Sequence, residues 1–526
     1  MESRCVRHTE LPHTTSLFAD FLYHFDRVAP FYPFPPLEWE SYRSAAAAIR
    51  YPAERRAALV AALRELNGES PALEQLARPE TLVVATGQQV GLCSGPAYTA
   101  YKALTALKLA RHLTARGLRA VPVFWMATED HDLGEVNHCW VFDPAGRPVR
   151  IEAAAAATAH TPAGRVVLPQ AVAPALRDSL AGFPHGGEVV GLIEESYVPG
   201  RTFAAAFAHL LQRLFGTRGL LVLDPLHPAF RALAAPLLRE AVQHAGHLAE
   251  RLAARNRSLE AAGYHVQVRV EPDTSLVFLL ADGARRPLRR NEGSYVMPGG
   301  ETVSAPELAA QAEKLSPNAL LRPVVQDYIL PTVACVAGPA ELAYLAQSQV
   351  LYEALLGRAP VFVHRASFTL LDPRGDKLMT RYGLGLTDLF ASETMLHERI
   401  ARMLTPPDLK ERLTAARERI AQEIEQVREE LRRFDPTLDE AMERSGRKIL
   451  YQLSKIERKT AREALRRDER ALRDAEYLHN LVYPHKHLQE RFYSILPFLA
   501  QRGLGTLEHI YESVRLDCPD HQVLVI

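Results

Sequence analysis

Five short apolar runs occur along the chain and alternate with longer amphipathic segments. The runs cover residues 82–85, 120–126, 219–224, 333–337 and 359–364, and several are rich in Val, Leu and Phe. Segments with helical spacing of apolar residues, such as 98–116 and 202–215, lie between them. Strand-length runs that alternate with amphipathic helices are typical of a parallel sheet covered by helices. The pattern therefore predicts an α/β fold with a parallel-sheet core.

Three regions depart from this alternation. Residues 1–80 read as helices, the last of which ends at Asn67-Gly68, a usual helix-terminating pair. Residues 139–153 alternate and turn at 143–146, which predicts a β-hairpin inserted into the core. A helical segment at 227–262 and a β-rich stretch at 265–296 predict a second insertion. After it, Ser316-Pro317 predicts a helix start, with Arg322 and Gln326 on one helix face.

A different pattern begins near residue 408. Apolar residues recur there at spacings of three and four between charged residues, pause at Asp435-Pro436, and resume to about residue 478. Asp before Pro is a helix start, so the segment predicts two helices that form an antiparallel coiled coil. Such an arm is about 40 Å long or more. Its one-sided apolar seam favours a homodimer.

These patterns divide the chain into consecutive parts. We expect an N-terminal helical region at 1–80, core segments at 81–138, 186–226 and 316–395, connecting insertions at 139–185 and 227–315, a coiled-coil arm at 396–480 and a C-terminal segment at 481–526.

The amino-acid composition indicates which partners and which cellular compartment to expect. The 526 residues hold 62 Lys and Arg against 62 Asp and Glu, and this zero net charge argues against nucleic acid as a partner. No run reaches the roughly 18 apolar residues of a membrane span, and no secretory leader is visible. Five scattered cysteines without a C-x-x-C pair predict reduced thiols and a cytoplasmic protein. Cys93 is expected to be a small buried residue rather than a nucleophile.

Polar residues gather where the predicted strands end. A glycine-rich stretch follows the first strand, and the acidic loop Glu129-Asp-His-Asp132 follows the second. Because the carboxyl ends of parallel strands share one edge of the sheet, these groups are expected to meet there. Gly-Pro pairs before two helices, at 95–96 and 338–339, offer backbone N–H groups to an anion. Asp132 has a second interpretation, as the cap of a following helix.

Several motifs, taken in order, resemble a known family. They are Thr86-Gly-Gln-Gln89, Gly95-Pro-Ala-Tyr-Thr-Ala-Tyr-Lys102, Pro122-Val-Phe-Trp125 with the acidic loop, Ser316-Pro-Asn318 with Arg322-Pro-Val-Val-Gln-Asp327, Gly338-Pro-Ala-Glu341 and Leu488-Gln-Glu-Arg491. Together they resemble the cysteine ligase family of bacillithiol biosynthesis, BshC, over nearly the whole chain. The resemblance implies a Rossmann-like core of the nucleotidyltransferase type with inserted connecting subdomains and a C-terminal antiparallel coiled coil.

The same resemblance implies an enzyme that joins the carboxyl group of L-cysteine to the amino group of glucosaminyl-malate. A carboxylate must be activated before it forms an amide, so a nucleotide (ATP or ADP) and Mg²⁺ are candidate cofactors. The chain departs from the wider nucleotidyltransferase pattern, because it has no His-x-Gly-His and no Lys-Met-Ser-Lys-Ser. Lys377-Leu-Met-Thr-Arg381 is a loose counterpart of the latter. The alternative is a non-catalytic scaffold that binds a nucleotide or sugar and dimerises through its coiled coil.

Roles follow for the gathered residues. Lys102 and the glycine loop suit anions, and the acidic loop suits an ammonium group, a proton acceptor or Mg²⁺. His131 is the expected base, with a flanking carboxylate expected to stabilise its charged ring, and it is not expected to bind a metal. The candidate catalytic residues are Lys102, Glu129, His131 and Asp132. The candidate substrate-binding residues are Thr86, Gly87, Gln88, Gln89, Gly91, Gly95, Tyr98, Trp125, Asn318, Arg322, Gln326, Asp327, Gly338, Glu341, Tyr344 and Lys377.

Overall fold

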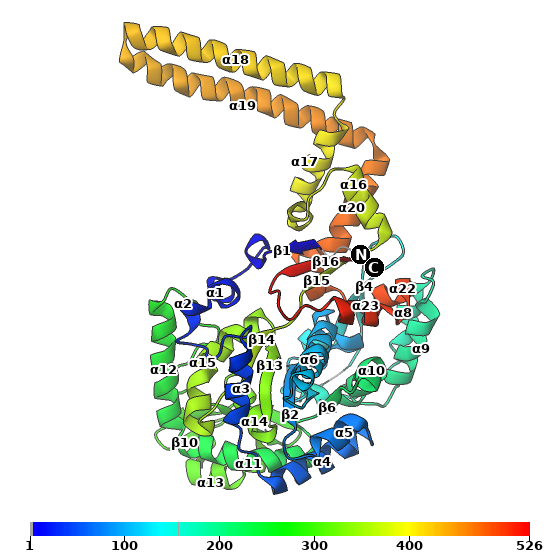
Figure 1. Ribbon diagram of the computed structural model, residues 1–526, viewed down its shortest axis with the longest axis vertical. Helices are drawn as coiled ribbons and strands as arrows, with labels where there is room; N and C mark the ends of the chain where they lie inside the picture. The colour runs from blue at the N-terminus through cyan, green and yellow to red at the C-terminus, as the bar shows by residue number, and fades with distance from the viewer. Residues whose placement is uncertain (1–3, 156) are drawn as a thin grey trace.

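A five-stranded parallel sheet forms the centre of the protein. The computed structural model describes residues 4–155 and 157–526, and its sheet has the order β14-β13-β2-β3-β6 (Figure 1). Every neighbouring pair is parallel. All five predicted strands are therefore confirmed. Their bounds are β2 Leu82–Gln88, β3 Ala120–Met126, β6 Leu221–Leu223, β13 Thr332–Ala337 and β14 Val361–His364.

Strand β2 is longer than its apolar run predicted. Gly87 was expected to begin a loop, but Gly87 pairs with Trp125 and Gln88 with Met126. A Cβ on Gly87 would lie 2.6 Å from the carbonyl oxygen of Trp125, so only glycine lets the two strands approach this closely. The strand thereby carries its polar residues to the edge of the sheet.

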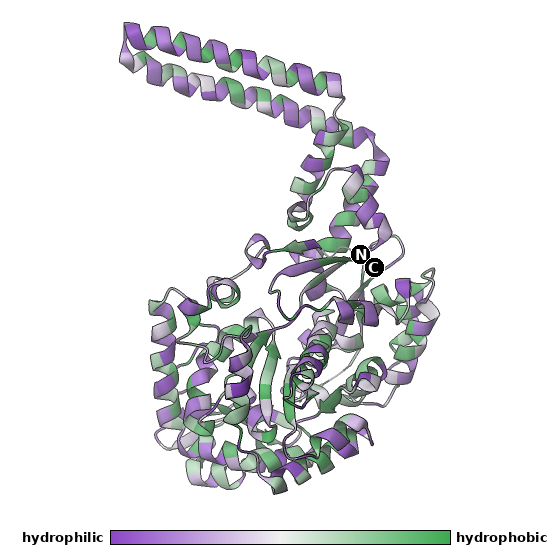
Figure 2. Cartoon of the chain, viewed as in Figure 1, coloured by the Kyte–Doolittle hydropathy of each residue, from purple (hydrophilic) through white to green (hydrophobic). Residues whose placement is uncertain are grey.

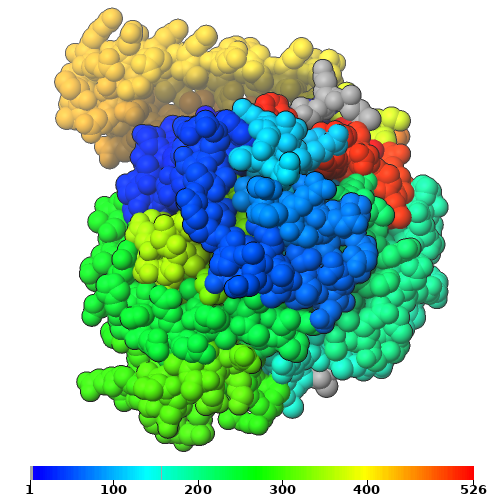
Figure 3. Space-filling model, turned by 60° about the horizontal axis from the view of Figure 1, so that its bottom comes forward, coloured from blue at the N-terminus to red at the C-terminus, as the bar shows by residue number. Residues whose placement is uncertain are grey.

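Helices cover both faces of the sheet. Apolar residues concentrate in the strands at the centre of the folded body (Figure 2). The N-terminal helices lie against the core (Figure 3), and Gly68 ends α4 with φ 67°, as Asn67-Gly68 predicted. The helices of the N-terminal region and core are α1 Ser16–Tyr23, α2 Phe25–Val28, α3 Trp39–Ala47, α4 Ala53–Asn67, α5 Pro71–Leu76, α6 Tyr98–Ala115, α10 Phe203–Phe215, α14 Arg322–Ile329 and α15 Pro339–Leu356.

Both insertions contain the predicted β structure. In the first, β4 (His138–Phe142) and β5 (Pro148–Glu152) form the antiparallel hairpin. Helices α7 Leu133–Val136, α8 Ala173–Leu180 and α9 Gly186–Ser196 accompany it. The second holds α11 Pro228–Gln243, α12 Ala245–Ala261, α13 Ala305–Ala310 and the strands β7 Val277–Ala281, β8 Ala284–Arg286, β9 Arg289–Asn291, β10 Ser294–Val296 and β11 Thr302–Ser304.

The helix start predicted at Ser316-Pro317 is wrong. Residues Leu315–Pro317 form strand β12, which pairs antiparallel with β7. Helix α14 begins later, at Arg322, after the Asn318 side chain has accepted the amides of Leu320 and Leu321 at 3.0 Å each. Tertiary pairing with the insertion thus overrides the local signal.

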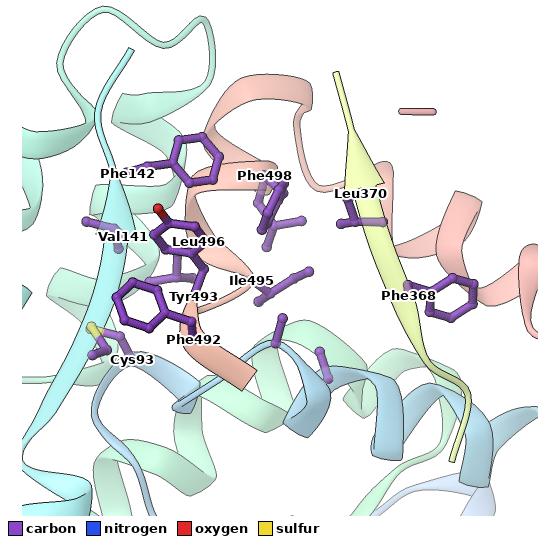
Figure 4. Packing of buried hydrophobic residues seen from close by; sticks show 14 of the residues in the cluster. Cys93, Val141, Phe142, Phe368, Leu370, Phe492, Tyr493, Ile495, Leu496 and Phe498 are labelled. Carbon is purple, nitrogen blue, oxygen red and sulfur yellow. The ribbon is translucent and has the colours of Figure 1, made fainter. Parts of the chain in front are cut away.

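A second, small sheet joins the two ends of the chain. Strand β16 (His521–Val525) pairs antiparallel with β1 (Arg4–Val6) and parallel with β15 (Phe368–Leu371). Beside it, side chains of β15, hairpin strand β4 and helices α21 (Gln489–Phe492) and α22 (Leu496–Arg502) pack into one apolar cluster that includes Cys93 (Figure 4). Helix α23 (Thr506–Ser513) precedes β16.

The arm is a hairpin of two long helices that projects from the body (Figure 1). Helices α18 (Pro407–Phe434) and α19 (Pro436–Arg467) have 28 and 32 residues, about 42 and 48 Å at 1.5 Å per residue. The Asp435 side chain caps α19, as predicted. The second helix was expected to run to residue 478, but it ends at Arg467 and α20 (Glu469–Val482) follows. Helices α16 (Pro373–Arg381) and α17 (Glu393–Leu404) connect the arm to the body.

The described residues include no helix whose length and apolar character would let it span a bilayer.

Candidate active site

A cavity of about 540 Å³ lies at the carboxyl edge of the parallel sheet. The ends of β2 and β3, the starts of α6 and α15, the second insertion and the C-terminal segment all contribute to its walls. Its polar and aromatic lining residues are Gln88, Gln89, Tyr98, Lys102, Trp125, Glu129, Asp130, Phe278, Arg285, Asn318, Arg322, Glu341, Tyr344, Arg365 and Arg491, together with the backbone of Gly87 and Gly338.

Lys102 ties two core elements together beneath this cavity. Its ammonium donates to the Gly87 carbonyl at 2.8 Å and to Gln88 Oε1 at 2.9 Å, and it is ion-paired with Glu341. Glu341 also accepts the amide of Gly338 at 2.7 Å, so the start of α15 is fixed in the same contact. Burial lowers the pKa of Lys102, and the charge of Glu341 opposes this shift. Lys102 therefore holds the end of β2 and the start of α15 together in the cavity wall, and the carboxylate of Glu341 balances its charge.

The residues of the acidic loop differ in position: Glu129 and Asp130 line the cavity, and Asp132 lies outside it. Glu129 is buried and forms an ion pair with Arg231 at 3.1 Å. Burial raises the pKa of Glu129, against the opposing charge of Arg231. Asp130 accepts Gln89 Nε2 at 2.7 Å, so the two loops that follow β2 and β3 are joined. Asp132 caps α7 by accepting the amide of Glu135 at 3.3 Å and does not line the cavity.

Arg285, from the second insertion, reaches this loop from the opposite wall. Its guanidinium donates to Ser316 Oγ at 3.0 Å and to the Pro317 carbonyl at 2.7 Å, and it lies 3.8 Å from the Phe278 ring centroid. Burial lowers the pKa of Arg285, which the charge of Glu129 opposes. The insertion thereby brings a permanent cation to the acidic loop.

His131, which was expected to share the pocket, lies behind Arg285 and does not line the cavity. Arg285 Nη1 donates to His131 Nδ1 at 3.4 Å. Burial and the charge of Arg285 lower the pKa of His131, and Asp130 only partly opposes them. The carboxylate of Asp130 does favour the charged ring, as expected, but burial and Arg285 outweigh it, so the pKa is lowered overall. The neutral imidazole, which is the form that accepts a proton, is favoured at neutral pH.

The cavity keeps two positive charges after its internal pairs are counted. Five lining cations face three lining carboxylates, while Arg365 pairs with buried Glu490 at 2.6 Å behind the wall and Glu129 pairs with Arg231. Arg322 binds the Tyr344 hydroxyl at 2.8 Å instead of a carboxylate. In the part of the chain that the structure describes, Arg285, Arg322 and Arg491 have no carboxylate within ion-pair distance. Such cations are available to an anionic ligand.

Trp125 lines this cavity and carries a buried hydrogen-bond donor. Its side chain is 1% exposed, and its Nε1 finds no acceptor among residues 4–155 and 157–526. A buried donor without a protein partner is typical of a position that a ligand or ordered water satisfies.

Comparisons with known proteins agree over the full length of the chain. A family model described as "Bacillithiol biosynthesis BshC, N-terminal Rossmann-like domain" matches residues 1–366, and one described as "Bacillithiol biosynthesis BshC, C-terminal coiled-coil domain" matches residues 368–526. The chain belongs to the BshC family.

Relatives in this family span nearly the same length. A protein of Solibacter usitatus described as "Putative cysteine ligase BshC" is 54% identical over 526 residues, which is 100% of both chains. Proteins with the same description from Koribacter versatilis and Symbiobacterium thermophilum are 39% and 32% identical, over 99% and 95% of each chain respectively.

Within this BshC fold, most of the candidate residues named from the sequence line one cavity. Of the remaining candidates, some are buried in the elements that form the cavity wall, and some lie away from the cavity. Thr86 binds the Val336 carbonyl at 2.9 Å between two core strands, and Gly91 and Gly95 pack against each other. Gln326 and Asp327 are on the buried face of α14, where the Gln326 amide donates to Asp327 at 3.0 Å.

Lys377 is not part of this cavity. It is exposed on helix α16, not on a loop, and α16 lies at the base of the arm. Since the cavity is built by core and insertion residues, a phosphate-loop role for Lys377 finds no support in its position.

Sequence reasoning passed over three arginines of the site. Arg285 sits in an arginine-rich stretch with no regular pattern, so nothing local marks it. Arg365 directly follows the last core strand, a position at the carboxyl edge that could have identified it. Arg491 ends one of the motifs that carried the family resemblance but was given no role.

Proposed function

We propose that the protein forms an amide between the carboxyl group of L-cysteine and the amino group of glucosaminyl-malate. The names of its BshC relatives support the ligase class. One observation carries the choice of substrates, namely a single cavity with a cationic side at Arg322 and Arg491 and an acidic side at Glu129 and Asp130. An acceptor with two carboxylates and one ammonium group has the complementary charges.

The two sides suggest an orientation for the acceptor. Its malyl carboxylates would lie toward the cationic side, where guanidinium groups can bind them in a bidentate manner. Its amine would lie toward Asp130 and Glu129, near His131.

His131 is suited to take the proton that the attacking amine must lose. Its ring is held beside Arg285 and is favoured in the neutral form. Arg285 also disfavours a charged imidazole, so a proton on His131, whose side chain is partly exposed, would be passed on readily to solvent. Glu129 stays ion-paired with Arg231 and shapes the acidic side instead of exchanging protons.

Activation of the cysteine carboxylate by a nucleotide is part of the proposal. A nucleoside triphosphate would supply the free energy and leaving group that amide formation needs. The backbone amides at the start of α15, which also lines the cavity, fit its phosphate charge. Mg²⁺ is proposed to arrive with the phosphates, since the described residues form no cluster of three or more His, Cys, Asp or Glu side chains suited to a metal.

The test is product formation by the purified full-length protein from cysteine, glucosaminyl-malate and ATP, followed by mass spectrometry. Arg322→Met should raise the KM for glucosaminyl-malate at least tenfold, on the scale of losing a charged hydrogen bond (~1.5–3 kcal/mol). Arg502→Met removes an exposed arginine of α22 and should leave KM unchanged. Binding of both substrates by calorimetry without turnover would favour the non-catalytic scaffold instead.

A further inference from the structure

A separate cavity of about 450 Å³ lies where the arm joins the body. Its walls come from α17, from the first turns of α18 and from the later turns of α19, which meet at this junction (Figure 1). None of its lining residues lines the candidate active site. Its volume is within the range of about 300–1,000 Å³ that small-molecule sites occupy. We call it the junction cavity.

Positive charge exceeds negative charge in the junction cavity. Five cations line it against two carboxylates. The two carboxylates are both used within the protein, because Glu398 pairs with Arg462 at 2.8 Å and Glu457 pairs with Arg417 at 3.6 Å. Three positive charges therefore remain after the internal pairs are counted.

The three remaining cations come from three different helices. Arg402 is on α17, Lys410 is on α18 and Arg458 is on α19. Among residues 4–155 and 157–526, no carboxylate lies within ion-pair distance of any of them. An anion in the junction cavity would therefore be contacted from all three helices at once.

The start of α18 adds to this positive potential. The helix has 28 residues and begins at Pro407, and no side chain caps its first turn. The N-terminal end of a helix carries a partial positive charge. Asp408 lies in the same turn but does not line the junction cavity, whereas Lys410 does. The helix end therefore supplements the three side-chain cations.

The junction cavity faces away from the apolar seam that favours a homodimer. Ile449 and Ile456 are exposed residues of that seam on α19. At 3.6 residues per turn, Ser454 and Arg458, which line the junction cavity, lie on nearly the opposite side of the same helix. A second copy bound along the seam would leave the junction cavity open to solvent.

The lining of the junction cavity indicates which part of an anionic ligand is recognised. No aromatic side chain of the described residues lines it, so a nucleotide base would find no ring on which to stack. Guanidinium and ammonium groups bind phosphate oxygens well. A chain of linked phosphates carries several negative charges on neighbouring oxygens, which three separate cations can share.

We propose that the junction cavity binds the phosphate chain of a di- or triphosphate. Arg402, Lys410 and Arg458 contact the phosphate oxygens, so the ligand ties α17 to both helices of the arm. The chain belongs either to an inorganic polyphosphate or to a nucleotide, since the same oxygens are bound in both. The proposal does not depend on ligase activity.

Inorganic tripolyphosphate is the probe, with the full-length protein in buffer free of Mg²⁺. Hydrogen exchange followed by mass spectrometry should show slower exchange in peptides that cover residues 398–417 and 454–462. ATP should protect the same peptides with a Kd within a few-fold of that of tripolyphosphate. Protection by ATP without protection by tripolyphosphate would overturn the proposal, and so would protection confined to peptides of the sheet-edge cavity.

Two double variants sharpen the test. Arg402→Met with Arg458→Met removes two of the three unpaired cations, and the Kd read from the junction peptides should rise about tenfold or more. Arg412→Met with Arg419→Met removes two exposed arginines from the opposite side of α18 and should leave that Kd unchanged. Both changes lower the net charge equally. Equal Kd values in the two double variants would contradict the proposal.

Discussion

Buried charges in this protein are held by partners that sit far away in sequence. Arg365 and Glu490 are 3% and 2% exposed at their side chains and form a bidentate pair, with Glu490 also accepting the Ser367 hydroxyl at 3.0 Å. Although burial opposes it, the charge of Arg365 lowers the pKa of Glu490 to about 2. This ion pair holds Arg365, an arginine of the candidate site, from outside the cavity.

Glu490→Gln should lower the free energy of unfolding by about 3–5 kcal/mol at pH 7, because it leaves Arg365 buried without a counter-charge. The folded-state pKa of Glu490 lies below its usual value near 4.5. Its stabilising effect is therefore complete above that value and is lost as the pH falls toward about 2. Urea unfolding of both proteins at pH 7 measures the difference.

Glu463→Gln is the matched control. Glu463 is exposed on the arm and pairs with Arg466 and Arg467 at 2.8 Å each. Surface pairs of this kind contribute little to stability, so its urea midpoint should stay close to that of wild type. A Glu490→Gln protein as stable as this control would show that the buried pair is dispensable.

His131→Ala should reduce turnover about 10²–10⁴-fold, the usual scale for loss of a general base. The thermal midpoint should change little, since His131 is only partly buried. The rate of product formation at saturating substrates decides this prediction. Asp132→Asn alters the cap of α7 and removes one charge that acts on His131, and it should keep activity within a few-fold of wild type. Equal activity of the two variants would require another base.

At the scale of whole elements, the helices of the arm carry apolar side chains that remain exposed in a single chain. On the arm, Leu409, Val427, Ile449 and Ile456 are 40–51% exposed, and Phe434 at its tip is 84% exposed. These residues lie on helices whose other faces carry many ion pairs. Apolar positions that repeat along a projecting coiled coil favour pairing with a second copy.

We therefore expect a homodimer that depends on this seam. The double variant Ile449→Glu and Ile456→Glu places two charges one heptad apart in the seam and should yield a monomer in light scattering at micromolar concentration. Gln452→Glu adds a charge at an exposed polar position of the same helix and should remain dimeric. Wild-type protein that is monomeric at this concentration would rule the dimer out.

At the scale of the whole molecule, the two ends of the chain pack together around buried neutral histidines. His8, His364 and His521 lie together, with ring centroids of 5.1 Å between His8 and His364 and 6.1 Å between His8 and His521. Burial lowers the pKa of His8 to about 3 and that of His521 to about 4, and it lowers the pKa of His364 strongly. Arg365 and Glu490 are the charged groups that face them.

Stability should therefore fall as the pH drops from about 6.5 toward 4. The unfolded chain binds protons in this range that the folded histidines do not bind, and by pH 4 each such group costs roughly 3 kcal/mol of stability. Urea midpoints at pH 7.5, 6 and 5 give the slope. His521→Gln should flatten it, whereas His24→Gln, at an exposed position, should not. An unchanged slope in His521→Gln would contradict this account.

Local patterns were enough to predict much of this architecture. The five core strands, the inserted hairpin, the Gly68 helix end and the Asp435 cap all depend on residues that are neighbours in sequence. The side-chain period of a strand and the chemistry of a cap are properties of a few consecutive residues. The sheet edge where Lys102 and Glu129 meet followed from these strands alone.

Other features depended on contacts between distant parts of the chain. The small sheet pairs strands of three to five residues from the two ends and the middle, and so short a strand carries almost no pattern of its own. Leu315–Pro317 became a strand because β7 was available to pair with it. Arg285 and Arg365 entered the site because an insertion and a residue 125 positions away hold them there. Burial and pairing of a charge are decided by its surroundings in space, which the spacing of residues along the chain does not record.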